Sequence, residues 1–247
     1  MENLVGRNPV HEALRAGRRR IERVLLAEGV AEKGTVEHIV ALCRQRRVAI
    51  ERVSKQEIDR LSGDVLHQGV AAHVSPYPYV EIDDILAPAR EGGEMPFVLA
   101  LDSLQDPQNV GSLMRTAEAV GVHGVILPDR RAVGVTPAVS RASAGAVEHL
   151  QVAMVKNLVR ALDELKERGL WIAGGEDHPE AVDYTGVDLN RPLALVLGSE
   201  GRGMRRLVAE RCDFLLRIPM RGRVGSLNVS VAGGILLYRA WHARQSP

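Results

Sequence analysis

Apolar positions in the first third of the chain switch between the spacing of helices and the spacing of strands. Strand-like runs cover residues 21–26, 48–50 and 69–74, and helix-like spacing covers residues 9–16, 36–44 and 55–61. Gly17 follows the first of these helices, and glycine commonly ends a helix. Short strands separated by amphipathic helices predict a compact α/β module.

Two groups of residues that break helices and strands follow this module. Prolines alternate with tyrosines in Pro76–Tyr79, and Glu91–Pro96 combines two glycines with a proline. Because proline continues neither a central strand nor a helix, we place a linker at residues 76–95. The predicted domains are therefore residues 1–75 and 96–247.

From Phe97 onward the pattern becomes a repeated alternation of short apolar strands and longer helices. The strand-like runs cover residues 97–101, 122–127, 170–173, 193–197 and 214–218, and the helices cover residues 109–120, 156–168 and 228–243. This alternation predicts a parallel sheet with helices on both faces. In such sheets ligands bind beyond the carboxyl ends of the strands, which directs attention to the segments after Leu101, Leu197 and Ile218.

The first of these segments leads into a helix through a polar loop. Asn109 stands where the residue that caps the helix is expected, and Arg115 lies opposite the apolar stripe of that helix. Capping and solvent exposure are the structural alternatives to a role in ligand binding for these two residues.

The second segment, Gly198 to Gly203, contains three glycines and Glu200 directly after an apolar strand. Glycines let a ligand approach the backbone closely. Their spacing, G-x-x-G-x-G, differs from the dinucleotide fingerprint, and the chain has no phosphate-loop motif. Glu200 is either an acid favoured by the first turn of a helix or part of a site.

The third segment joins the strand that ends at Ile218 to the last helix. Ser226 and Asn228 are both candidates to cap that helix, and capping alone explains one of them more readily than both. The glycine pair Gly233-Gly234 allows close packing of the helix. Because all three segments meet at one edge of the predicted sheet, we expect their polar side chains to form a cluster there.

Composition narrows the classes of function. The net charge is +1 and aromatic residues make up 3% of the 247 residues, which argues against recognition through rows of stacked bases. Cys43 and Cys212 have no His or Cys neighbours at ligand spacing, so we expect neither a disulfide framework nor a metal site. The chain begins with no secretory signal pattern and has no apolar run long enough to cross a bilayer, so we expect a cytoplasmic protein without membrane contact.

In order and spacing, the three segments resemble the three motifs of the SpoU (TrmH) branch of the SPOUT methyltransferases. The resemblance covers residues 97 to 243 and rests on Asn109 with Arg115, on Gly198-Ser199-Glu200 with Gly203, and on Ser226 to Ser230. The N-terminal segments Gly6–Leu14 and His67–Val70 are similar to parts of the L30e/L7Ae-like substrate-binding domain of ribosomal members. This module would grip RNA through its basic residues, Arg18–Arg20 and Arg44, Arg46 and Arg47, and solvated helix ends and loops are the alternative reading of these residues. The whole chain resembles 23S rRNA guanosine-2′-O-methyltransferases of the RlmB type.

The resemblance implies a SPOUT catalytic domain with a parallel sheet, whose C-terminal part is threaded into a deep trefoil knot. It implies a homodimer, ribosomal RNA as substrate and S-adenosyl-L-methionine as methyl donor. By position, the residues implied to line the cofactor pocket are Leu197, Gly198, Ile218, Met220 and Leu227.

The resemblance also implies catalytic roles for Asn109, Arg115, Glu200, Ser226 and Asn228. The family assigns the base that removes the ribose proton to the arginine at position 115. A guanidinium is always protonated in proteins, so a bidentate clamp on the RNA phosphate beside the target ribose agrees better with its charge. The two asparagines would place the ribose, Glu200 would hold Arg115 or a backbone N–H, and Ser226 would shape the loop.

Several alternatives stay open at this point. The substrate could be a guanosine of tRNA or an adenosine of rRNA, as in antibiotic-resistance members of the family. A protein of the same fold could also bind RNA without catalysis, as a ribosome assembly factor does. A nicotinamide-dependent oxidoreductase fits less well because of the glycine spacing.

Overall fold

The computed structural model describes residues 1–63 and 66–245. The chain forms two compact units, the first made of residues 1–78 and 135–149 and the second of residues 79–134 and 150–247. The sequence assigns residues 135–149 to the second domain, whereas the structure packs them with the first unit. The predicted end of the second domain at Pro247 lies outside the described residues.

The first unit is a four-stranded mixed sheet in the order β1-β4-β2-β3. Its strands are β1 (Glu2–Val5), β2 (Ile21–Ala27), β3 (Ala49–Val53) and β4 (Val70–Val74). Its helices are α1 (Arg7–Ala16), α2 (Thr35–Arg46), α3 (Lys55–Ser62), α6 (Pro137–Ala142) and the 3₁₀ helix η1 (Ala146–His149). Gly17 ends α1 in the left-handed conformation, as predicted. The sequence pattern missed β1, which pairs antiparallel with β4.

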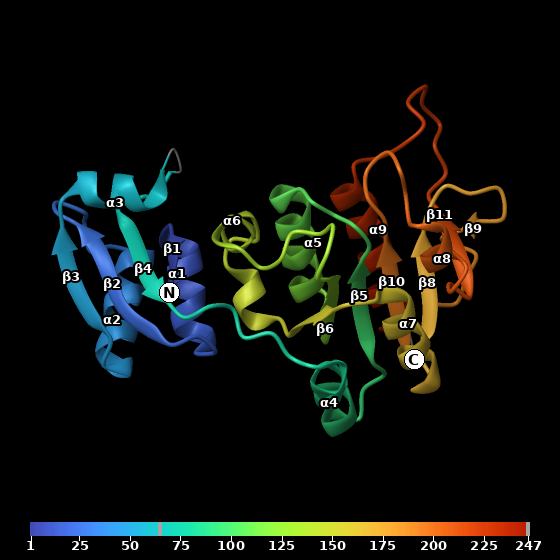
Figure 1. The fold of residues 1–247 in the computed structure, drawn as a ribbon, viewed down its shortest axis with the longest axis horizontal. Helices are drawn as coiled ribbons and strands as arrows, with labels where there is room; N and C mark the ends of the chain where they lie inside the picture. Colours follow the sequence, from blue (N-terminus) through green and yellow to red (C-terminus); the bar gives the residue numbers. More distant parts are fainter. Residues whose placement is uncertain (64–65, 246–247) are drawn as a thin grey trace. The chain divides into compact units, whose positions relative to one another are not determined.

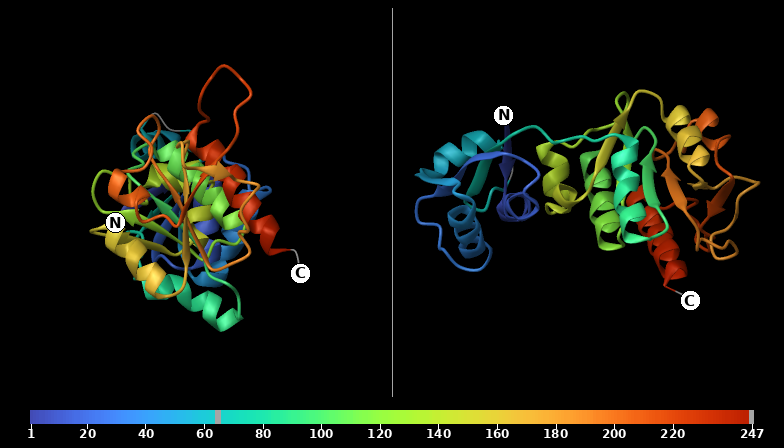
Figure 2. Two further views of the ribbon diagram at one scale, coloured as in Figure 1. Left: turned by 90° about the vertical axis from the view of Figure 1, so that its right-hand side faces the viewer. Right: turned by 90° about the horizontal axis from the view of Figure 1, so that it is seen from below.

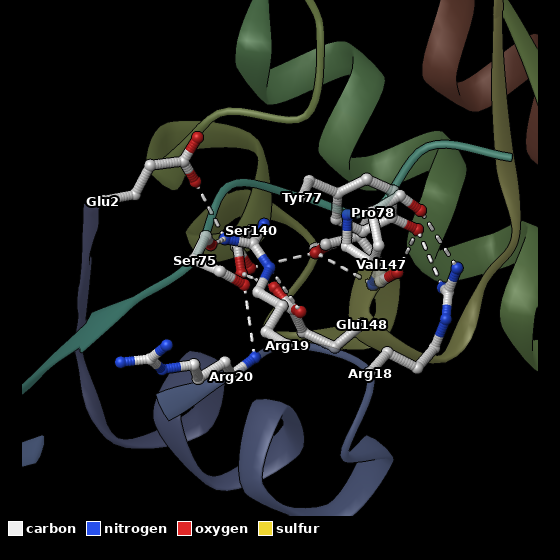
Figure 3. A network of polar contacts seen from close by, with 11 residues as sticks. Glu2, Arg18, Arg19, Arg20, Ser75, Tyr77, Pro78, Ser140, Val147 and Glu148 are labelled. Atoms are coloured by element: carbon white, nitrogen blue, oxygen red, sulfur yellow. Dashed lines mark hydrogen bonds and ion pairs between the residues drawn. The ribbon is translucent and has the colours of Figure 1, made fainter. Parts of the chain in front are cut away.

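A buried arginine, Arg19, connects β1, the chain after β4 and the segment 135–149 within this unit (Figure 3). Its side chain is fully buried, pairs with Glu2 at 2.8 Å and Glu148 at 3.0 Å, and lies over the Tyr77 ring. We predicted from the sequence that the basic run Arg18–Arg20 grips RNA. For Arg19 this prediction is wrong, because its guanidinium is enclosed between two carboxylates and cannot reach a phosphate.

The second unit is a sheet of seven parallel strands in the order β7-β6-β5-β10-β8-β11-β9 (Figure 1). The strands are β5 (Phe97–Leu101), β6 (Gly124–Pro128), β7 (Val152–Val155), β8 (Trp171–Gly175), β9 (Val182–Asp183), β10 (Leu193–Leu197) and β11 (Phe214–Arg217). The predicted parallel sheet is confirmed. The predicted bounds of β5 and β10 agree with the structure, and both strands are buried along their whole length, as their unbroken apolar sequences require.

Helices cover both faces of this sheet, as predicted. They are α4 (Ile82–Gly92), α5 (Pro107–Ala119), α7 (Leu158–Glu167), α8 (Arg206–Ala209) and α9 (Val229–Arg244). Alternate residues of the strands pack with α4, α7 and α8 in one hydrophobic core. Helices α5 and α9 pack against each other (Figures 1 and 2). Gly233 permits this approach, because a Cβ there would lie 2.4 Å from a methyl carbon of Leu113.

Candidate active site

The carboxyl ends of β8, β10 and β11 and the start of α9 surround a cavity of about 650 Å³. Leu197, Leu216 and Leu236 form an apolar part of its wall, and the backbone of residues 198–203 forms another part. All five residues predicted for the cofactor line this cavity: Leu197, Gly198, Ile218, Met220 and Leu227. Volume and lining are typical of a site for a small molecule. We name this space the cofactor cavity.

The loop after β10 is folded tightly against itself. Ser199 and Gly203 exchange two backbone hydrogen bonds of 3.0 and 2.9 Å, which close the loop. Gly198 lies under this closure, and a Cβ there would be 2.2 Å from the Gly203 carbonyl carbon and the Met204 nitrogen. Gly201 and Gly203 have φ values of 74° and 65°, which favour glycine. The three glycines are therefore explained by the shape of the loop itself.

Three of the predicted catalytic residues meet through hydrogen bonds. The Asn228 side-chain amide donates to Asn109 Oδ1 at 2.9 Å and also to Glu200 Oε1. Glu200 Oε1 also accepts the Val229 N–H at 3.4 Å, at the positive end of α9. Asn228 Oδ1 caps α9 by accepting the N–H groups of Ser230 and Val231. Capping and participation in the cluster are thus both roles of Asn228.

Asn109 has a different place from the one that the sequence indicated. Helix capping, the structural alternative that the sequence left open for Asn109, is wrong because Asp106 caps α5, accepting the N–H groups of Gln108 and Asn109. Pro107 occupies the first turn, where its missing N–H costs nothing. The helix therefore begins two residues earlier than predicted, which frees the buried Asn109 side chain to bond with Asn228.

Ser226 and Arg115 stand apart from this cluster. Ser226 lines the cofactor cavity from the exposed loop between β11 and α9. Arg115 is exposed on α5, and among the described residues no hydrogen bond or ion pair joins it to Asn109, Glu200 or Asn228. Arg115 lies six positions after Asn109 along the helix, which places it about 9 Å further along the axis and roughly a third of a turn around it. The suggestion that Glu200 holds Arg115 has no such contact to support it; Glu200 binds the Val229 N–H instead.

Glu176, at the end of β8, also lines the cofactor cavity and was missed by sequence reasoning. Burial raises the pKa of its carboxyl group, although the Met204 N–H donates to it and lowers the value. Its Oε2 is buried without a hydrogen-bond partner among residues 1–63 and 66–245. The predicted strand ended at Ala173, two residues before the end of β8 at Gly175. The expectation that ligands bind beyond the carboxyl ends of strands was therefore not applied to Glu176.

Asp102, at the end of β5, is a second residue that the sequence did not single out. It is fully buried, and its two carboxylate oxygens accept hydrogen bonds from the Arg205 backbone N–H at 2.8 Å and from Arg205 Nε at 2.7 Å. This contact fixes the end of the loop that follows β10 to the neighbouring strand. Its position directly after an apolar strand is the feature of the sequence that could have identified Asp102 as part of the site.

Within the described part of the chain, no three His, Cys, Asp or Glu side chains come together as a metal ion would require. No described helix combines the length and the apolar surface needed to cross a membrane.

Both ends of the chain match models of known protein families. Residues 96–238 match the model of the SpoU rRNA methylase family. Residues 4–80 match the model of the RNA 2′-O ribose methyltransferase substrate-binding domain. The two matches agree with the resemblance predicted for each end of the chain.

Relatives match along nearly the whole chain. The Bacillus subtilis protein YacO, named as a TrmH-family tRNA/rRNA methyltransferase, is 47% identical over 242 residues, covering 98% of this chain and 95% of YacO. The SpoU methyltransferase AviRb of Streptomyces viridochromogenes, solved with AdoMet, has a TM-score of 0.81 and 25% identity, covering 99% of this chain and 91% of that one. An AdoMet-bound rRNA methyltransferase of Sinorhizobium meliloti has a TM-score of 0.79 and 26% identity, covering 99% and 88%. These similarities confirm the predicted α/β fold.

Proposed function

The chain belongs to the SpoU rRNA methylase family and is an S-adenosylmethionine-dependent RNA methyltransferase; from this we propose that it methylates the 2′-hydroxyl of a guanosine ribose in 23S rRNA. The observation that carries the proposal is the loop of residues 198–203, which lines the cofactor cavity and also supplies Glu200 to the cluster with Asn109 and Asn228. A methyl donor and a ribose would therefore meet across one loop. The cytoplasm is the proposed location.

The cofactor cavity fits S-adenosylmethionine. Apolar side chains and exposed loop backbone suit an adenine ring, which is recognised by N–H and C=O groups between apolar walls. The unpartnered Glu176 oxygen would accept a hydrogen bond from the bound molecule. A Cβ at Gly175 would lie 2.7 Å from Leu236 and 2.8 Å from Leu197, so glycine keeps this part of the wall compact. When bound, the cofactor supplies a methyl group already activated on a sulfonium.

The residues of the protein then have to align the ribose and accept its proton. Asn109 and Asn228, fixed by their mutual bond, would present polar groups to the ribose from a rigid support. Holding the 2′-oxygen in line with the methyl group accounts for much of the acceleration expected in such a transfer. Arg115, exposed and permanently charged, would clamp the phosphate beside the target ribose, and the proton would pass to that phosphate or to water.

The first unit favours ribosomal RNA over tRNA as the substrate. It matches a substrate-binding domain of ribose methyltransferases, and the Sinorhizobium meliloti relative that shares both units is an rRNA methyltransferase. Arg20, Arg44 and Arg47 are exposed on this unit and can contact phosphates. An adenosine of rRNA or a guanosine of tRNA is the alternative target.

We also propose a homodimer that uses the outer face of α9. Val231, Tyr238 and Trp241 recur at intervals of seven and three residues, so they share one side of the helix, and each is at least 37% exposed. Exposed apolar and aromatic clusters of this kind mark interfaces more often than free surface. Sedimentation of the Tyr238→Lys variant should show a monomer, whereas an unchanged mass would exclude this face.

The activity is tested with purified protein, methyl-labelled S-adenosylmethionine, and unmodified transcripts of 23S rRNA and of tRNAs. We expect label in 23S rRNA, recovered after nuclease digestion as 2′-O-methylguanosine. Label in tRNA alone, in another nucleoside, or on a base would contradict the proposed target.

Arg115 is tested separately from the cofactor cavity. Arg115→Lys and Arg115→Ala should lower methyl transfer while the affinity for S-adenosylhomocysteine, measured by calorimetry, stays unchanged. The lysine variant should keep more activity than the alanine variant, because it retains a charge without the fork geometry. Loss of cofactor binding in both variants would exclude the clamp.

A further inference from the structure

A second cavity, of about 520 Å³, lies on the other side of the loop that bounds the cofactor cavity. Its lining residues follow β5, β6 and β10 and include Asn109, Arg131, Glu200, Arg202 and Arg205; Val229, at the start of α9, also lines it. Because these three strands are neighbours in the sheet, their carboxyl ends meet at one place. The central strand β10 thus separates two cavities.

The cluster of Asn109, Glu200 and Asn228 forms part of the wall between the two cavities. Asn109 lines the second cavity, Asn228 lines the cofactor cavity, and Glu200 lines both. A group bound in the second cavity is therefore next to the residues that we assign to the ribose. The assignment of a ligand to the second cavity rests on the proposed function, because it takes these residues to bind the ribose.

Charge distinguishes the second cavity from the first. Three arginines line it, Arg131, Arg202 and Arg205, whereas only Arg202 among them also lines the cofactor cavity. Its two carboxylates are already engaged, since Asp106 accepts the N–H groups that begin α5 and Glu200 bonds to Asn228 and Val229. The lining therefore carries three positive and two negative charges, a net of +1.

Arg205 is held in place by Asp102, and all three arginines have unused donors. Asp102 binds Arg205 through its Nε and backbone N–H, which leaves both terminal nitrogens of that guanidinium for other partners. Within residues 1–63 and 66–245, no side-chain hydrogen bond or ion pair engages Arg131 or Arg202. Arg131 has a φ of 60° and Ser103 has a φ of 63°, a costly conformation for residues other than glycine. The Val133 N–H donates to the Leu104 carbonyl at 2.9 Å and ties the two loops together.

We propose that this second cavity binds a second backbone phosphate of the RNA strand, next to the one assigned to Arg115, with Arg131 and Arg202 as its principal contacts. Guanidinium forks match phosphate oxygens in geometry and charge. No aromatic ring occurs among the described residues that line the cavity, so it is built for a phosphate and sugar rather than for a stacked base. Arg205, oriented by Asp102, is a supporting contact.

The test compares Arg131→Gln with the matched control Arg160→Gln. Arg160 is also exposed in the second unit but lies on α7, outside both cavities. Binding of an in vitro 23S rRNA transcript is measured by filter retention between 50 and 200 mM salt without cofactor, and S-adenosylhomocysteine binding is measured by calorimetry. For Arg131→Gln we expect about three- to tenfold weaker RNA binding, a salt slope smaller by about 0.7 to 0.9, and unchanged cofactor affinity.

Arg202→Gln should weaken RNA binding in the same way, and Arg131→Lys should recover part of the affinity. If Arg131→Gln binds RNA like Arg160→Gln, or loses cofactor affinity instead, the phosphate site is wrong. A wild-type protein that binds rRNA through Arg131 but transfers no methyl group would refute the proposed function alone. A wild-type protein that methylates rRNA with no contribution from Arg131 would refute this inference alone.

Discussion

The tight closure of the loop after β10 can be tested by adding a single carbon atom. In Gly198→Ala the new Cβ would lie 2.2 Å from two backbone atoms, the Gly203 carbonyl carbon and the Met204 nitrogen. Backbone atoms cannot rotate away as a side chain does. To go from 2.2 Å to an ordinary contact of 3.4 Å, the loop has to move by about 1.2 Å.

A shift of this size breaks the two backbone hydrogen bonds between Ser199 and Gly203. Each contributes roughly 1 kcal/mol, so the closed loop should become about 2 kcal/mol less favourable. If the cofactor binds only the closed loop, its affinity should fall about 30-fold. Calorimetric titration with S-adenosylhomocysteine measures this loss, and thermal unfolding shows whether the domain stays folded.

Gly222→Ala is the matched control, because a Cβ at Gly222 meets nothing within 4 Å and its φ is not positive. It should bind the cofactor like the wild type. If Gly198→Ala also binds the cofactor with wild-type affinity and unfolds at the wild-type temperature, the loop is not the rigid wall that we describe.

Two further predictions concern buried carboxylates. Burial raises the pKa of Glu176 above 4.5, so this group stabilises the fold at low pH and loses that contribution as the pH rises through the raised pKa. In urea unfolding of the apoprotein, Glu176→Gln should therefore be more stable than the wild type at pH 8 and equally stable near pH 4. A stability advantage of the variant that grows toward acid pH would contradict burial as the cause of the shift. Glu148→Ala should lower the free energy of unfolding by about 3 kcal/mol, because Arg19 loses a buried partner. Glu51→Ala, the control, breaks an exposed ion pair with Arg23 and should lower it by at most about 1 kcal/mol. Equal losses of stability in the two variants would refute the role of burial.

The regular part of the fold was predictable because it depends on local patterns. The unbroken apolar sequences of β5 and β10 and the apolar stripes of α5 and α7 each indicate which residues are buried. The two-residue strand β9 and the membership of residues 135–149 in the first unit depend on distant partners. The burial of Arg19 is of the same kind, since its partners Glu2 and Glu148 are far away in the sequence.

The candidate site was predictable where its residues lie at the carboxyl ends of strands. This position and the family resemblance brought Asn109, Glu200 and Asn228 together, and the structure joins them by hydrogen bonds. Glu176 was missed because glycines hid the end of its strand, and Arg131 because an isolated loop arginine looks like any surface residue. The roles of Arg115 and Ser226 stay predictions.

The central claim is that this protein places a 2′-O-methyl group on a guanosine of 23S rRNA. It is tested most directly by mapping ribose methylation along 23S rRNA from cells with and without the gene. We expect that one guanosine loses its 2′-O-methyl group without the gene and regains it on expression of the wild-type protein, but not of Arg115→Ala. A methylation map of 23S rRNA that is identical with and without the gene would contradict it.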